Sequence, residues 1–88
     1  MNTTPTSAVR LARAIVRTRL PTDVETVLCP PAISVPDVAR AVTGTSIRVG
    51  VQNVTWREAG AYTGEISLAM LEGVADFVII GHSERRSL

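Results

Sequence analysis

The feature that most constrains the fold of this chain is the regular alternation of helix-like and strand-like segments along its 88 residues. Helical spacing of apolar residues and helix-capping residues predict helices over residues 5–20, 34–42 and 66–72. Short, apolar, β-prone runs predict strands over residues 25–29, 47–51 and 76–80. Strands that alternate with helices favour right-handed βαβ units in a parallel sheet. The predicted fold class is therefore α/β.

Three parallel strands form a sheet with two open edges, and this limits what the chain does on its own. No bulge pattern, proline or run of lysines protects those edges. A barrel of alternating strands and helices needs eight strands and about 250 residues, of which this chain supplies roughly a third. The sequence thus predicts a single, incomplete domain over residues 1–88 that must be completed or will self-associate.

Residues with cap or stop preferences mark the expected ends of the first two helices. Thr4 followed by Pro5 is typical of a helix start, and Pro21 is expected to end that helix. Ser34 and Asp37 resemble a capping pair at the start of the second helix.

The charge of the chain is too balanced to favour binding to nucleic acid. Nine basic and eight acidic residues give a net charge of +1. The one local excess is a group of arginines on the first helix, Arg10, Arg13, Arg17 and Arg19. These form either a solvated helix face or a surface for an anion or RNA, and the sequence leaves both interpretations open.

Cys29 is the only cysteine, so the chain forms no intrachain disulfide, and its apolar strand indicates a small core residue. One cysteine and one histidine provide no zinc-ligand spacing, and no metal is expected. The apolar runs are far shorter than the roughly 20 residues of a membrane span, and no secretory signal is visible. We therefore expect a cytoplasmic protein with no membrane partner.

His82 is the most informative polar residue, because it follows the third predicted strand and precedes a helix that starts near Glu84. The carboxyl ends of parallel strands hold the catalytic residues of α/β barrels. The partial positive charge of a helix start disfavours imidazolium, and a neutral imidazole can donate a hydrogen bond to a carbonyl oxygen. The alternative is a surface or capping histidine, and the helix dipole is a sufficient structural reason for Glu84.

A long loop is expected over residues 52–64, and such loops are usually functional. Gln52 and Asn53 end the second strand on the same face as His82, or they simply form a turn. Trp56 and Tyr62 either pack locally or anchor a partner, where aromatic residues are favoured.

Four segments, taken together, resemble the triosephosphate isomerase family. Residues 81–86 (Gly-His-Ser-Glu-Arg-Arg) resemble the signature after the fourth strand of that family, and residues 60–67 resemble its third loop. Residues 51–53 and 29–31 resemble the ends of its third and second strands. The segments occur in the order and spacing of the family, and the resemblance runs from residue 1 to residue 88. It implies a partial TIM (β/α)8 barrel that consists of parallel strands 2–4 with their helices.

The resemblance also implies an activity and roles for individual residues. The family interconverts dihydroxyacetone phosphate and glyceraldehyde 3-phosphate in glycolysis and gluconeogenesis, without a cofactor or metal. By resemblance, His82 is the catalytic electrophile, and Ser83 holds the catalytic base while the lid is open. Glu84 resembles the partner of the catalytic lysine, and Asn53 is similar to a residue beside that lysine.

Other residues resemble a subunit interface. Thr63 is similar to the residue that reaches into the active site of a neighbouring subunit, and Tyr62 stands where the family often has Phe. Glu65 and Arg85 resemble partners in an ion pair across the dimer interface. The resemblance thus implies a homo-oligomer of the completed unit.

The resemblance places the catalytic lysine before Met1, and the glutamate base and the lid after Leu88. Because catalytic groups act as a set, we expect this chain alone to be inactive. It is either one part of a split enzyme or an inactive truncated fragment begun at an internal methionine. In the first case a complementary chain supplies the missing strands, the lysine and the base. A third interpretation is a non-catalytic barrel module that self-assembles through its open edges.

Overall fold

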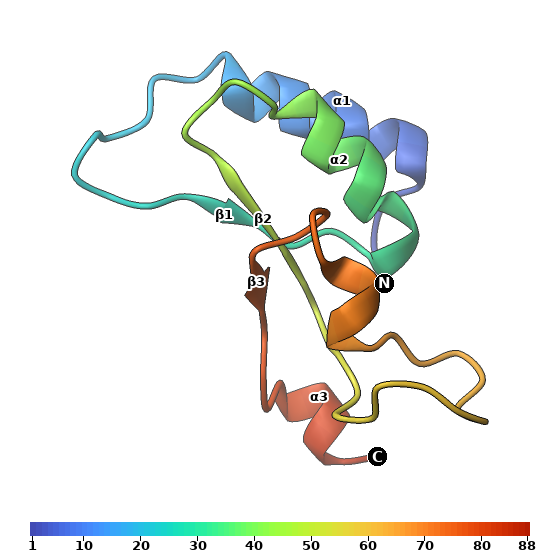
Figure 1. Cartoon of the computed structure of the whole chain (residues 1–88). Coiled ribbons are helices and arrows are strands. Elements are labelled where there is room, and N and C mark those ends of the chain that lie inside the picture. The colour runs from blue at the N-terminus through green and yellow to red at the C-terminus, as the bar shows by residue number, and fades with distance from the viewer.

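A three-stranded parallel sheet, with helices α1 and α2 on one side of it, forms the centre of the structure (Figure 1). The structure is a computed structural model that describes residues 1–88. Its elements follow in the order α1 (Pro5–Val16), β1 (Val27–Leu28), η1 (Ala32–Ser34), α2 (Val35–Ala41), β2 (Arg48–Val51), η2 (Leu68–Leu71), β3 (Phe77–Val78) and α3 (Ser83–Arg86). The alternation of helices and parallel strands confirms the predicted α/β class.

The strand order is β1-β2-β3, so β2 is central and each outer strand exposes one edge. β1 pairs with the first half of β2 and β3 with the second half, in the register Val27–Arg48, Leu28–Val49, Gly50–Phe77 and Val51–Val78. The outer strands are only two residues long, shorter than the five-residue strands expected. A strand extends only where it pairs with a neighbour, and each outer strand pairs with only half of the four residues of β2.

Helix α1 begins as the sequence predicts but ends earlier. Thr4 and Ser7 form a reciprocal capping box, and Pro5 occupies the first turn. The helix ends at Val16 with Arg17 as its C-cap, so the prediction that Pro21 ends it was wrong. The backbone has already left the helix before the proline ring acts on it.

The predicted capping pair at the start of α2 is also wrong. Ser34 is the N-cap residue, but its hydroxyl makes no capping bond and is buried without a hydrogen-bond partner. Asp37 forms an ion pair with Arg40 instead. The packing of η1 against both α1 and α2 encloses the Ser34 side chain and removes it from the backbone N–H groups it was expected to meet.

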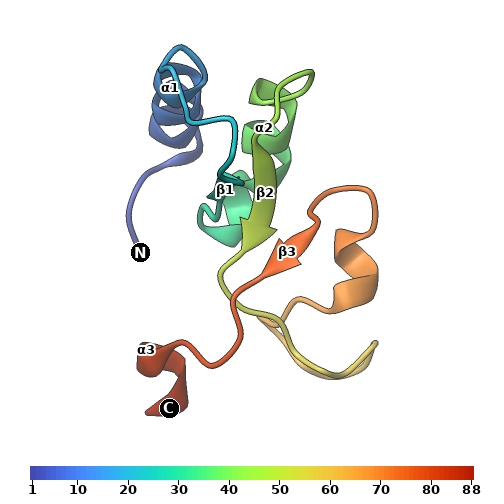
Figure 2. The same ribbon diagram turned by 90° about the vertical axis from the view of Figure 1, so that its left-hand side faces the viewer.

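The core lies between the two helices and β2, where α1 and α2 cover one face of the sheet (Figure 2). Its buried apolar residues are small or β-branched: Ala8, Ala12, Val35, Val38, Val42, Ile47, Val49 and Val51. Small alanines on α1 let the two helices approach, and β-branched side chains suit the pleated strand. No helix is long and apolar enough to cross a membrane.

Away from this core, large apolar side chains are exposed, and several of them lie near β3 and η2. Ile80 is 82% exposed and Phe77 is 40% exposed, and Leu68 and Met70 lie on the surface nearby. Only 11 of 88 residues are buried, which is little for an apolar chain. Apolar surface beside an unpaired strand edge is a site for association.

We therefore expect the isolated chain to self-associate. Size-exclusion chromatography with light scattering should give masses well above the 9.4 kDa of one chain. Ile80→Lys, which adds charge beside the β3 edge, should shift the distribution towards monomer. Val24→Lys is the matched control, because Val24 is also exposed but lies in the turn before β1. A monomer with a cooperative thermal transition would contradict the argument from open edges.

Candidate active site

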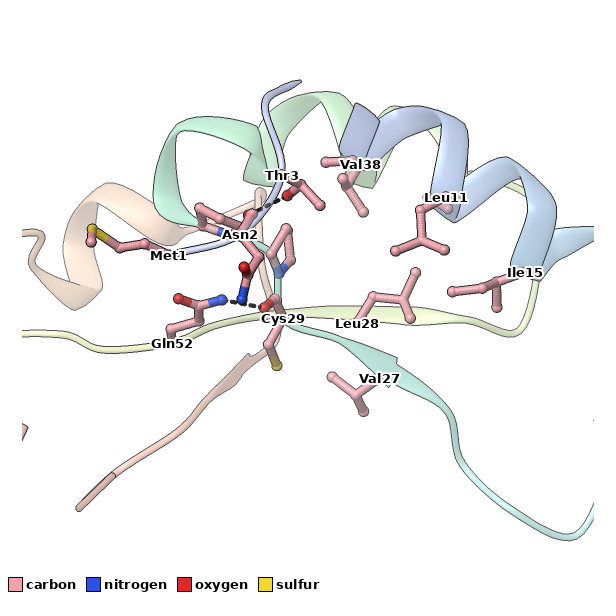
Figure 3. Close-up of a pocket in the computed structure, with 14 residues that line it drawn as sticks. Met1, Asn2, Thr3, Leu11, Ile15, Val27, Leu28, Cys29, Val38 and Gln52 are labelled. Carbon is pink, nitrogen blue, oxygen red and sulfur yellow. Dashed lines mark hydrogen bonds between the residues drawn. The ribbon is translucent and has the colours of Figure 1, made fainter. Parts of the chain in front are cut away.

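The carboxyl ends of the three strands point towards the same end of the molecule, where α3 and the loop over residues 52–67 also lie (Figure 1). The segments that follow the strands begin with Cys29, Gln52 and Ile79, and the last of them turns at Gly81. The Gln52 side chain ties two of them together, because its Nε2 donates to the carbonyl oxygen of Cys29 at 2.8 Å (Figure 3). The sequence marked Gln52 only as a strand end and gave no signal for this contact.

His82 is held in one orientation by the turn that it starts. It is the N-cap residue of α3, and its Nδ1 accepts a hydrogen bond from the backbone N–H of Glu84 at 3.2 Å. An imidazole whose Nδ1 accepts a bond is neutral with its proton on Nε2, so the free donor is the Nε2–H. The side chain is exposed, which leaves that donor open to a ligand.

The turn before His82 depends on glycine. Gly81 has a positive φ of +74°, which favours glycine over any residue with a side chain. The Arg86 guanidinium lies over it, at 2.7 Å from the position that a Cβ would occupy. Ser83 and Glu84 follow in the first turn of α3, and both are exposed. The backbone N–H of Glu84 orients His82, and its carboxylate interacts favourably with the partial positive charge at the start of the helix.

A cavity of about 180 Å³ brings several of the predicted residues together. Gln52, Asn53, Glu65 and Arg85 contribute to its lining, whereas His82, Ser83 and Glu84 do not. Arg85 and Glu65 form an ion pair at 3.6 Å within the single chain. Their pairing across a subunit interface stays a prediction. The cavity lies between the end of β2, the loop and α3. Its charged pair, Glu65 and Arg85, can bind polar groups.

The loop is closed at its base by a backbone hydrogen bond from Thr55 to Ile66 at 2.9 Å. Beyond this point, the loop carries two aromatic residues that both face the guanidinium of Arg57. This group lies 3.6 Å from the ring centre of Trp56 and 5.4 Å from that of Tyr62. Trp56 is 77% exposed even so. The packing is thus local but leaves a large aromatic surface uncovered, and the anchoring of a partner stays a prediction.

The tip of the loop is shaped by tight turns around Tyr62. Its N–H donates to Gly60 and its carbonyl accepts from Glu65, both at 2.9 Å. Thr63 follows at the tip and is exposed. The interface roles of Tyr62 and Thr63 stay predictions, and the exposure of both side chains is compatible with them.

The sequence did not indicate an apolar groove of about 300 Å³ between α1, β1 and the first residues of the chain. In Figure 3, Leu11 and Ile15 of α1 point towards Leu28 of β1, and Val27 points to the other side of the strand. The groove runs along the open edge of β1. Cys29 lies at its end, and burial raises the pKa of this thiol despite an opposing backbone hydrogen bond from Gly50. Such a cysteine is a poor nucleophile, in agreement with a packing role.

The chemistry that the described groups offer is hydrogen bonding and charge. The nitrogen, oxygen and sulfur groups of His, Cys, Asp and Glu nowhere gather in sets of three or more that suit a metal ion. The free donor of His82 lies at the end of β3, and a polar cavity lies beside β2. Such a site can polarise a small oxygen-rich substrate once further groups join it.

Comparisons with known proteins agree with this arrangement. The family model described as triosephosphate isomerase matches residues 1–88. The triosephosphate isomerase of Caldanaerobacter subterraneus subsp. tengcongensis is 45% identical over 87 residues, which cover 98% of this chain and 35% of the relative. That of Clostridium tetani is 44% identical over 87 residues, covering 98% of this chain and 34% of the relative. The chain thus spans about a third of the length of these curated isomerases. It belongs to the triosephosphate isomerase family.

Proposed function

We propose that this chain forms strands 2–4 of a triose-phosphate isomerase and supplies the electrophile of its active site. The reaction interconverts dihydroxyacetone phosphate and glyceraldehyde 3-phosphate, a cytoplasmic step of glycolysis and gluconeogenesis, without a cofactor. The chain is active only when a complementary chain supplies the remaining strands, a lysine and a glutamate base. The completed unit then forms a homo-oligomer. Family membership and the orientation of His82 support this proposal.

The observation that carries the proposal is the hydrogen bond from the Glu84 N–H to Nδ1 of His82. It leaves the Nε2–H of a neutral imidazole as donor to the carbonyl oxygen of the triose phosphate. When the base removes a proton from the adjacent carbon, negative charge develops on that oxygen, and the donor stabilises it. A neutral imidazole suits this task, because its Nε2–H can donate a hydrogen bond to the oxygen without a prior change of protonation.

The other site residues act around this donor. The backbone N–H of Glu84 bonds to His82, and its exposed carboxylate would pair with the lysine of the completed site. Ser83, in the first turn of α3, would hold the glutamate base before the substrate binds. Asn53 lines the cavity beside β2 and would position the same lysine. Each role requires groups from the complementary chain.

The surface of the chain supports the need for completion. The groove beside β1 exposes Leu11, and the far edge exposes Phe77 and Ile80. Covering such surface stabilises a complex by roughly 25 cal/mol per Å² of apolar area. The same surface favours a second candidate, a non-catalytic module that assembles with copies of itself.

A chimaera tests the proposed function directly. Residues 1–88 replace the matching stretch of the Caldanaerobacter enzyme, with which they share 45% identity. We expect isomerase activity from the folded chimaera and none from the isolated chain. A soluble chimaera with native-like circular dichroism and no activity contradicts the catalytic assignment and favours the self-assembling module. The unmodified Caldanaerobacter enzyme, prepared in parallel, is the control for folding and assay.

A further inference from the structure

A second feature lies on the helical side of the molecule, away from the strand ends. α1 and α2 pack against each other, and a hollow of about 470 Å³ lies along α1 where α2 begins. Its lining includes Thr6, Arg10, Arg13 and Arg17 from α1 or its end, and Asp37 from α2. No residue of the sheet or of the candidate active site takes part. The hollow is therefore independent of the proposed function.

The arginines of this hollow have no acidic partners. The three ion pairs of the chain use Arg40, Arg48 and Arg85 instead. No Asp or Glu occurs before Asp23, so nothing on α1 itself offsets the charge. The one carboxylate in the hollow, Asp37, is already paired with Arg40. The hollow thus carries a net positive charge, because its three arginines face one carboxylate that is already paired with Arg40.

The helix places these charges in a line. Arg10, Arg13 and Arg17 are three and four residues apart, which puts them on one stripe of α1. At a rise of about 1.5 Å per residue, the stripe is about 10 Å long. Arg19 lies beyond the helix end and does not contact the hollow. The Thr6 hydroxyl, at the other end, adds a neutral donor.

We propose that the hollow binds a small linear oligophosphate, such as a di- or triphosphate chain. Guanidinium groups bind phosphate oxygens through paired N–H donors, and three long arginine side chains along one stripe can converge on the oxygens of a short phosphate chain. The volume of about 470 Å³ falls in the range of small-molecule sites, roughly 300–1,000 Å³. An RNA surface fits less well, because binding of single strands relies on aromatic stacking and α1 has no aromatic residue.

The test is isothermal titration calorimetry, in which inorganic triphosphate is added to the 88-residue chain in about 150 mM salt, near physiological ionic strength. Arg13→Gln removes the central guanidinium, keeps helix propensity, and should weaken binding about tenfold. Arg19→Gln is the matched control, because it removes the same charge three residues beyond the helix end without touching the hollow. It should weaken binding less than about twofold, since salt screens the distant charge. Circular dichroism of both variants checks that α1 is retained.

Two further ligands identify the source of the phosphate chain. Equal binding of ATP and triphosphate supports recognition of the phosphates alone, and tighter binding of ATP supports a nucleotide ligand. Equal losses in Arg13→Gln and Arg19→Gln overturn the proposal, because they indicate only general attraction. It is also overturned if millimolar triphosphate does not bind, or if an oligouridylate RNA binds more tightly than triphosphate.

Discussion

Replacing His82 with Gln should lower the turnover number of the completed isomerase by about 10²–10³-fold, the usual cost of removing one donor to a developing oxyanion. The Gln amide reaches about as far as Nε2 of His82, but Gln has no acceptor at the position of Nδ1. It therefore loses the bond that the Glu84 N–H makes to Nδ1 at 3.2 Å, and with it the contact that holds the donor in place. The donor acts mainly on the transition state, so kcat should fall while KM changes little.

The measurement is steady-state kinetics of the chimaera described above, with and without the substitution. Ser87→Ala, at the C-terminal end of the same helix, is the matched control, because it removes only the hydroxyl that donates to the Glu84 carbonyl at 2.9 Å. It should change kcat by less than about threefold, since no reacting atom is involved. Unchanged turnover in His82→Gln contradicts the electrophile role, even if the chimaera is active.

Replacing Gly50 with Ala should destabilise the completed fold by about 1–3 kcal/mol, the usual cost of overpacking. Gly50 lies in the central strand β2, between the two outer strands. A Cβ there would lie 2.9 Å from Cys29 Sγ, 3.0 Å from Phe77 Cβ and 3.1 Å from the Phe77 carbonyl oxygen. The backbone carbonyl belongs to the paired strand β3, so relief requires the strands to separate.

Urea unfolding of the chimaera measures this cost, because the completed barrel offers a cooperative transition. Gly44→Asn is the control: Gly44 has a φ of +82° and open space around it, and Asn tolerates that conformation better than other residues. It should cost less than about 1 kcal/mol. The double variant Gly50→Ala/Cys29→Ala should recover only part of the loss, because the Phe77 contacts remain. If Gly50→Ala lowers the free energy of unfolding no more than Gly44→Asn does, the argument from close packing at β2 is contradicted.

The order of elements could be predicted because it follows from local signals. Helical spacing in α1 and apolar runs around β2 and β3 are visible in short windows. Strand length could not be predicted in this way, because β1 and β3 extend only where β2 accepts their bonds. The cap at Ser34 failed for a similar reason: tertiary packing of η1 encloses the hydroxyl, and no local pattern reveals this.

The candidate site divides along the same line. The position of His82 at the end of β3 follows from the chain alone, whereas its tautomer depends on the turn that brings the Glu84 N–H to Nδ1. The tie from Gln52 to Cys29 joins residues 23 positions apart and left no mark in the sequence. The groove beside β1 is likewise made by elements that are distant along the chain. The order of the elements was predictable, and side-chain contacts between elements were not.

The bond that orients His82 joins residues only two positions apart, and the turn around it consists of Gly81, His82 and the start of α3. Both partners of this bond therefore lie within one short segment, and an exchange of that segment between members of the family would move them together. The orientation of His82 is in this sense a property of residues 81–86 and not of contacts with distant elements.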